Sequence, residues 1–146
     1  MRANPMVEDK DGSTALRAAA EYGFCSMLRY LVRECCANTI NAINTVRGKD
    51  GMTLLVVAAA KKTADMTKLL LEMGANLHLR GEHGCSVLHI AAGFGCIETI
   101  GALLDAGPTI EDSGTTDSDT PLLAAARNGR AETTGLGNKT RLWDSR

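Results

Sequence analysis

The sequence predicts an all-α solenoid, in which short helix–turn–helix units stack side by side and their connecting turns protrude. One observation is a recurring segment in which Thr or Ser is followed by aliphatic residues and a pair of alanines. It occurs at Gly12–Ala20, Gly51–Ala59, Gly84–Ala92 and Ser118–Ala126. The other is its period of 33 residues between the second and third copies and 34 between the third and fourth. A fixed period of this size is typical of repeat proteins.

The first helix of each unit begins after a hydroxyl side chain. Thr14, Thr53, Ser86 and Thr120 occupy the same place in the four copies. A hydroxyl there can accept a hydrogen bond from an unpaired amide of the first helical turn. The alanines that follow allow a neighbouring helix to approach closely, and aromatic residues make up only 3% of the chain. We therefore expect a core of closely packed helices with small and aliphatic contact residues.

A turn and a second helix complete each unit. Gly23, Gly95 and Gly129 mark the turn in three units, whereas Lys62 and Thr63 replace the expected Gly-His in unit two. Apolar residues at helical spacing follow in units two and three: Met66, Leu69 and Leu70, then Ile97, Ile100, Leu103 and Leu104. Gly74 and Gly107 are expected to end these helices in the left-handed conformation.

The first and last units depart from this pattern. Unit one has Cys35-Cys36 at its helix end, where a helix can run on towards Asn38, and an insertion near residues 37–47 accounts for its longer spacing. Unit four has two glycines in place of an apolar second helix, which weakens helix formation by about 2 kcal/mol. We expect the chain to be part or a variant of a longer protein. The expected divisions are a lead-in at 1–8, a repeat domain at 9–132 with units near 9–47, 48–80, 81–114 and 115–132, and an irregular or frayed tail at 133–146.

These segments resemble the ankyrin repeat, whose signature is Thr-Pro-Leu-His-x-Ala in a period of 33 residues. Thr120-Pro121-Leu122 matches its first three letters, and Ser86 to Ala92 follows it with Ser for Thr and Val for Pro. Leu69 to Asn76 is similar to the family's helix end, Leu-Leu-Leu-x-x-Gly-Ala-Asp/Asn. The resemblance covers roughly residues 8–132. It implies stacked helix pairs that bind another protein through their turn tips and concave helix face.

Composition and charge narrow the classes of function. Sixteen basic and seventeen acidic residues give a formal net charge of −1, so no overall field attracts nucleic acid or anionic lipid. No apolar run reaches the length of a membrane span, and the N-terminus lacks a secretory signal. Five cysteines without a disulfide pattern favour a reducing compartment. We expect a cytoplasmic location, with the nucleus as an alternative.

For the residues that could form a catalytic, metal or phosphate site, the sequence favours structural roles. Cys85 and His89 could share one helix face as a nucleophile and its base, but no third, orienting group is evident, and His89 occupies the family's structural position. The cysteines are too scattered for a closed zinc site. Gly93-Phe94-Gly95 lies between two helices, which does not suit a phosphate loop. The hydroxyl-rich turn at 115–119 is expected to be an ordinary solvated turn, although phosphorylation there is conceivable.

The resemblance also implies which residues would face a partner. These lie at turn tips and first-helix positions in all four units: Lys10, Asp11, Ser13, Glu21 and Tyr22; Arg47, Lys49, Asp50, Met52 and Lys61; Arg80, Glu82, His83, Cys85 and Phe94; and Asp117, Asp119, Arg127 and Asn128. Tyr22, Met52, Arg80 and Phe94 are expected at its centre, because aromatic, Met and Arg side chains are enriched at interface centres.

The leading hypothesis is a non-catalytic protein-binding module that needs no cofactor, metal, small-molecule substrate or nucleic acid and does not insert into a membrane. One rival is the targeting segment of a larger enzyme, such as a kinase, acyltransferase or ubiquitin ligase. The other is a nucleic-acid-associated regulator, whose binding would weaken steeply with salt. The sequence identifies neither the partner nor the oligomeric state.

Overall fold

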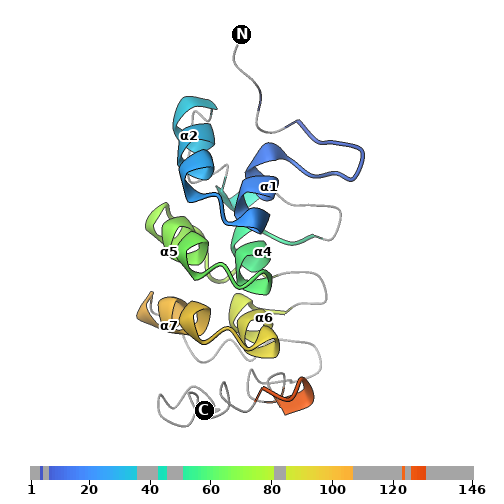
Figure 1. The fold of residues 1–146 in the computed structure, drawn as a ribbon, viewed down its shortest axis with the longest axis vertical. Coiled ribbons are helices and arrows are strands. Elements are labelled where there is room, and N and C mark those ends of the chain that lie inside the picture. Colours follow the sequence, from blue (N-terminus) through green and yellow to red (C-terminus); the bar gives the residue numbers. More distant parts are fainter. Residues whose placement is uncertain are drawn as a thin grey trace.

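The computed structural model describes residues 4, 7–35, 43–45, 51–80, 85–106, 123 and 126–130. Within these ranges six helices form three successive pairs (Figure 1). They are α1 (Ala15–Tyr22), α2 (Cys25–Cys35), α4 (Leu54–Ala60), α5 (Ala64–Glu72), α6 (Val87–Phe94) and α7 (Ile97–Asp105).

The three helix pairs stack in one direction. The first helices, α1, α4 and α6, form one column, and the second helices, α2, α5 and α7, form another beside it (Figure 1). Each first helix contacts its own second helix, α4 also contacts both α1 and α6, and α5 contacts both α2 and α7. The predicted all-α solenoid of helix–turn–helix units is confirmed.

Each first helix begins with the expected hydroxyl cap. Thr14, Thr53 and Ser86 are buried and have extended backbones, and each side-chain oxygen accepts a hydrogen bond from the backbone amide three residues later at 3.2–3.3 Å. The cap satisfies one of the amides that a helix N-terminus leaves without an intrahelical partner. Thr120 lies outside the described residues.

The turn inside each unit requires a left-handed residue. Gly23, Gly95 and Gly129 have φ angles of 74°, 71° and 66°. In unit two the same position is held by Lys62, with φ of 60°, the one non-glycine residue of the described chain with positive φ. A side chain makes this conformation costly by about 1–2 kcal/mol. The replacement of glycine noted in the sequence therefore changes the residue but not the turn.

The ends of the second helices are only partly described. Gly74, with φ of 91°, follows the C-cap residue Met73 and ends α5 as predicted. Gly107 lies outside the described residues. Asn38, towards which the second helix of unit one was expected to run on, also lies outside them. The described helix α2 ends at Cys35.

The core lies between the stacked units. Residues 54–59 of α4 are all buried, because α4 is covered by α1 on one side and by α6 on the other. In the second column Met66, Leu70, Ile100 and Leu103 are at most 1% exposed. Removing apolar surface from water contributes about 25 cal/mol per Å², so this burial is the main source of stability.

Part of the predicted insertion joins unit one to the far end of unit two. Within residues 37–47 the structure describes 43–45, where Ile43 is 1% exposed and belongs to the core. The Asn44 side-chain amide donates to the Gly74 carbonyl at 3.1 Å, and its oxygen accepts from the Asn76 amide at 2.7 Å. Asn44 therefore fixes the segment that follows α5.

The predicted unit boundaries contain the three described helix pairs, but their exact positions stay predictions. The second helix of unit four and the tail at 133–146 lie outside the described residues. None of the described helices is both long enough and apolar enough to cross a membrane.

Replacing Lys62 by glycine is expected to stabilise the protein. Lys62→Gly removes the strain of a side chain at positive φ, and the added freedom of glycine in the unfolded chain offsets part of this gain. We predict a free energy of unfolding higher by about 0.5–1 kcal/mol in urea denaturation. Lys62→Ala keeps the Cβ atom and should remain close to the parent protein. A Lys62→Gly variant less stable than Lys62→Ala would contradict this account.

Candidate protein-binding surface

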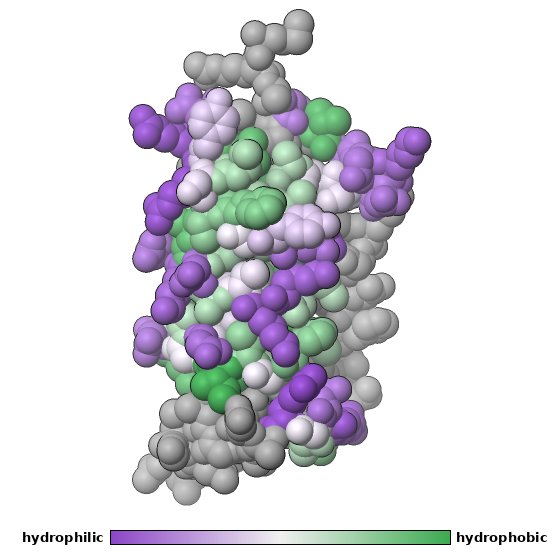
Figure 2. All heavy atoms as spheres, in the orientation of Figure 1, coloured by the Kyte–Doolittle hydropathy of each residue, from purple (hydrophilic) through white to green (hydrophobic). Residues whose placement is uncertain are grey.

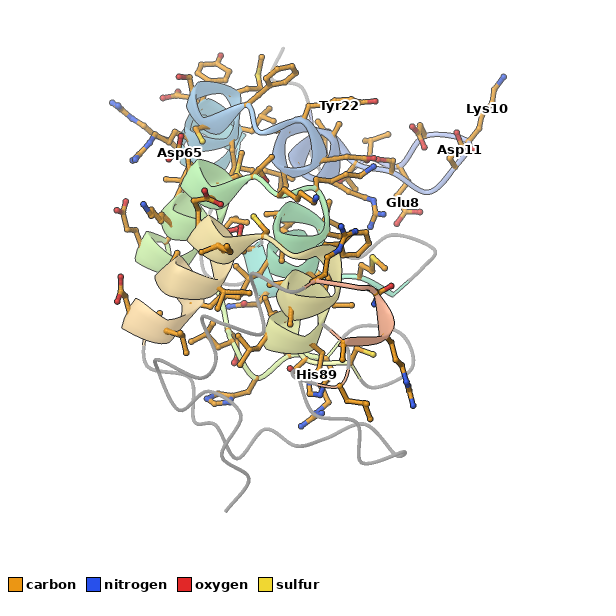
Figure 3. The ribbon with its side chains drawn as sticks, turned by 60° about the horizontal axis from the view of Figure 1, so that its bottom comes forward. Glu8, Lys10, Asp11, Tyr22, Asp65 and His89 are labelled. Carbon is orange, nitrogen blue, oxygen red and sulfur yellow. The ribbon has the colours of Figure 1, made fainter. Side chains whose placement is uncertain are left out.

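The loop that precedes α1 presents a rigid tip. The Asp9 carboxylate accepts hydrogen bonds from the amides of Asp11 at 2.9 Å and Ser13 at 2.8 Å. Gly12 turns the chain with a φ of 72°, and its amide donates to the Asp9 carbonyl at 3.0 Å. Lys10 and Asp11 are exposed, whereas Ser13 is half-buried. Figure 3 shows this loop extending away from the helices.

A row of exposed side chains marks the ends of the first helices. Tyr22, Lys61, Phe94 and Asn128 directly precede the left-handed residue of the four units. All four are exposed, and the exposed fraction is 68% for Tyr22 and 43% for Phe94. Stacking has therefore aligned side chains that the sequence separates by more than thirty residues. We call these four residues the helix-end row.

An ion pair joins two of the predicted binding residues across neighbouring units. The Lys61 ammonium lies 2.9 Å from a Glu21 carboxylate oxygen. The Glu21 side chain is 29% exposed and that of Lys61 is 52% exposed. The pair joins a residue of α1 to the C-cap residue of α4, and its two charges balance each other.

Phe24 is a surface residue that the sequence analysis missed. Its ring stacks on Tyr22 with centroids 5.9 Å apart and an angle of 23° between the planes. Phe24 is 60% exposed, so the two rings form an aromatic surface at the turn between α1 and α2. Stacked rings are rigid and bury large area, which suits protein contacts. The sequence signal was the Tyr-Gly-Phe triplet at 22–24.

The expected centre of the surface is only partly exposed. Tyr22 and Phe94 are exposed, but Met52 is half-buried and packs against the core. Arg80 and Cys85 are also half-buried. The apolar contribution therefore comes from the aromatic residues more than from Met52.

Other predicted residues are exposed or lie outside the described part of the chain. Arg127 and Asn128 of unit four are exposed. Seven predicted residues fall outside the described ranges: Arg47, Lys49, Asp50, Glu82, His83, Asp117 and Asp119.

A groove of about 480 Å³ borders the helix-end row. It runs along the turns of units one and two towards α7 and is lined in part by Tyr22, Lys62 and Met66. Its carboxylates are Asp65 and Glu98, which lie in the first turns of α5 and α7. A carboxylate in the first turn of a helix is favoured by the helix dipole. Neither residue was predicted for the surface.

His89 has a structural environment. It is 4% exposed, and its Nδ1 atom lies 2.6 Å from the hydroxyl of Ser86, which is 2% exposed. Because the Ser86 oxygen accepts from the His89 amide, its own hydrogen can be donated to Nδ1. Both groups are shielded from a substrate, which agrees with the support role expected for His89.

The described cysteines differ in burial. Cys96 is 5% exposed, and its Sγ atom lies 2.9 Å from the Thr99 hydroxyl oxygen. Cys25 and Cys85 are half-buried. Among the described residues, no three histidine, cysteine or acidic side chains are grouped closely enough to hold a metal ion.

Fold and surface together define a helix-pair repeat protein with a row of exposed aromatic and charged side chains. Residues 1–81 match the family model described as ankyrin repeats (3 copies), and residues 88–134 match the model described as ankyrin repeats (many copies). The chain belongs to the ankyrin-repeat family.

Three relatives of this chain are similar over much of its length. It is 29% identical to the B-cell lymphoma 3 protein homolog of Mus musculus, over 84% of the chain and 34% of the relative. It is 30% identical to the ANK repeat-containing protein nipk-1 of Caenorhabditis elegans, over 82% of the chain and 20% of the relative. It is 32% identical to the nuclear factor NF-kappa-B p105 subunit of Rattus norvegicus, over 67% of the chain and 10% of the relative. The chain thus spans between a tenth and about a third of these relatives.

The family and these relatives support a protein–protein interaction module as the general class of this chain.

The ion pair between units should contribute a small, salt-dependent coupling. We predict a coupling energy of about 0.2–1 kcal/mol for Glu21 and Lys61 in a double-mutant cycle with Glu21→Gln and Lys61→Met. The coupling should nearly disappear in about 1 M salt, since exposed charges are then screened. A coupling that is unchanged at high salt would show that the two side chains interact through packing instead.

Ser86→Ala should destabilise the protein more than Thr14→Ala. Both changes remove a helix cap, which costs about 1 kcal/mol. Only Ser86→Ala also removes the buried hydrogen bond between the Ser86 hydroxyl and Nδ1 of His89, which adds about 1–3 kcal/mol. Chemical denaturation of the two variants measures this difference. Equal losses would mean that the Ser86–His89 contact contributes nothing beyond the cap.

Proposed function

We propose that this chain is a non-catalytic module that binds a protein partner through its loop tips and the concave face of its first helices. The observation that carries the proposal is the helix-end row, in which Tyr22, Lys61, Phe94 and Asn128 are exposed and aligned. Apolar rings presented beside charged side chains are the usual composition of a protein interface.

The charges along this surface support a protein as the ligand. Lys10 and Asp11 share one loop tip, Glu21 and Lys61 form an ion pair, and the formal net charge of the chain is −1. A nucleic acid needs a basic track that neutralises many phosphates. Alternating charges instead favour a partner with its own mixture of acidic and basic side chains.

The fold keeps the cost of association low. Tyr22, Lys61 and Phe94 of the helix-end row lie at the ends of α1, α4 and α6, whose inward faces are buried against neighbouring helices. The tip at Lys10 and Asp11 is held by the Asp9 carboxylate. Side chains on fixed backbones lose little freedom on binding, so more of the contact energy remains as affinity.

The proposed contact set contains the predicted residues of all four units. Its exposed members in the described part of the chain are Lys10, Asp11, Tyr22, Lys61, Phe94, Arg127 and Asn128. The proposed location is the cytoplasm, with the nucleus as the alternative; one similar protein is named a nuclear factor.

A pair of matched variants tests the proposal. Tyr22→Ser with Phe94→Ser alters the helix-end row, whereas Lys68→Ser with Asp105→Ser alters exposed positions on the second helices. Each tagged variant is used to capture proteins from cell extract, and circular dichroism checks its helix content. We expect the helix-end variant to keep its helix content. It should capture at least about tenfold less of a specific protein that the parent captures. The control should match the parent.

If the helix-end variant and the control retain the same proteins in equal amounts, the proposed surface is wrong.

A further inference from the structure

Unit one has an outward face that the units after it do not expose. We call the side of each helix pair that is turned towards the preceding unit its leading face. In units two and three this face is covered by the helices of the unit before it, as shown by the contacts of α1 with α4, α2 with α5, α4 with α6 and α5 with α7. Comparing equivalent positions in the three units identifies the residues of the face.

The first equivalent position lies in the second helices. Met27 of α2 is 51% exposed, whereas Met66 of α5 and Thr99 of α7 are fully buried. Each of these residues stands thirteen positions after the capping residue of its unit. Met27 is thus an apolar side chain at a position that the repeat otherwise buries completely.

The next helical turn shows the same contrast. Tyr30 is 61% exposed, whereas the equivalent residues Leu69 and Ala102 are 3% and 7% exposed. Tyr30 lies three residues after Met27, so the two side chains share one side of α2. Arg29 lies on another side, since its guanidinium is 3.7 Å from Glu72 of unit two.

The first helix and the turn extend the face. Ala15 is exposed, whereas its equivalents Leu54 and Val87 are 1% exposed. At the turn, Phe24 is 60% exposed, whereas the equivalent Thr63 of unit two is half-buried and the equivalent Cys96 of unit three is 5% exposed. Figure 2 shows apolar surface over the α1–α2 unit.

We propose that this leading face, formed by Ala15, Phe24, Met27 and Tyr30, is a stacking surface for one more helix pair of the same repeat type, supplied by a longer form of this chain. The face continues the interfaces between units one and two and between units two and three, in the same direction and at the same positions. The relatives that this chain matches are about three to ten times as long as the matched part. A helix pair that presents an aliphatic trailing side would cover the four side chains.

Within the described residues, a second copy of the chain finds no open trailing side that would complement this face. In the established interfaces the leading face of one unit meets the trailing side of another. The trailing side of unit three is already in contact with unit four, because Arg130 Nε donates to the Gly93 carbonyl at 3.4 Å. A Cβ atom at Gly95 would lie 2.7 Å from the Arg130 side chain. Through the surfaces of the described residues, two copies could therefore meet only leading face to leading face, which is not the geometry of the stack.

The experiment adds a unit to the full chain. A copy of residues 48–80 is placed directly before residue 9, which preserves the repeat register, and hydroxyl-radical footprinting compares this protein with the parent. We expect modification of Met27 and Tyr30 to fall at least about fivefold, towards the burial of Met66 and Leu69. Phe94 serves as the internal reference and should be modified equally in both proteins, because it is 43% exposed and units one and two separate it from the added unit.

Two controls complete the test. An added unit that carries Leu55→Asp and Leu70→Asp in the copy cannot bury its core and should leave Met27 and Tyr30 as reactive as in the parent. Sedimentation of the parent protein should show a monomer. The proposal is overturned if the intact added unit gives no protection. It is also overturned if the parent forms a dimer that Tyr30→Lys abolishes, since a second copy would then cover the face.

Discussion

The burial of one helix pair against the next is the constraint on which the structure depends. A pair such as α4–α5 has too little interior of its own, and its buried residues become a core only because α1 and α2 lie on one side and α6 and α7 on the other. The same stacking fixes the register of the surface. It aligns Tyr22, Lys61 and Phe94, and it brings Glu21 within 2.9 Å of Lys61. Recognition by this chain would therefore depend on the same contacts that provide its stability.

Much of the fold could be predicted from the sequence because each unit repeats the same local signals. The capping residues Thr14, Thr53 and Ser86 and the left-handed Gly23 and Gly95 lie where the repeat places them. Local chemistry determines these features: an unpaired amide needs an acceptor, and a tight turn needs positive φ. A prediction from spacing alone is sufficient for such features.

The remaining features depend on contacts between units, which spacing does not show. The sequence indicated that Lys62 replaces the glycine of the turn, but only the structure shows that its backbone keeps the left-handed conformation of glycine. Asn44 fixes the segment after α5 across thirty residues or more, and the Tyr22–Phe24 stack depends on how the turn directs both rings. Met52 was expected at the surface centre, yet it is half-buried because it packs against the core.

Amide hydrogen exchange of a Leu55→Ala variant tests the central claim most directly. Leu55 is 2% exposed in the middle unit, so its truncation removes core packing between α4 and its neighbours. If stacking holds the units together, amides of α1 and α6 should lose protection along with those of α4. Loss of protection confined to α4 and α5, with α1 and α6 unchanged, would show that the units are stable independently and would contradict the account.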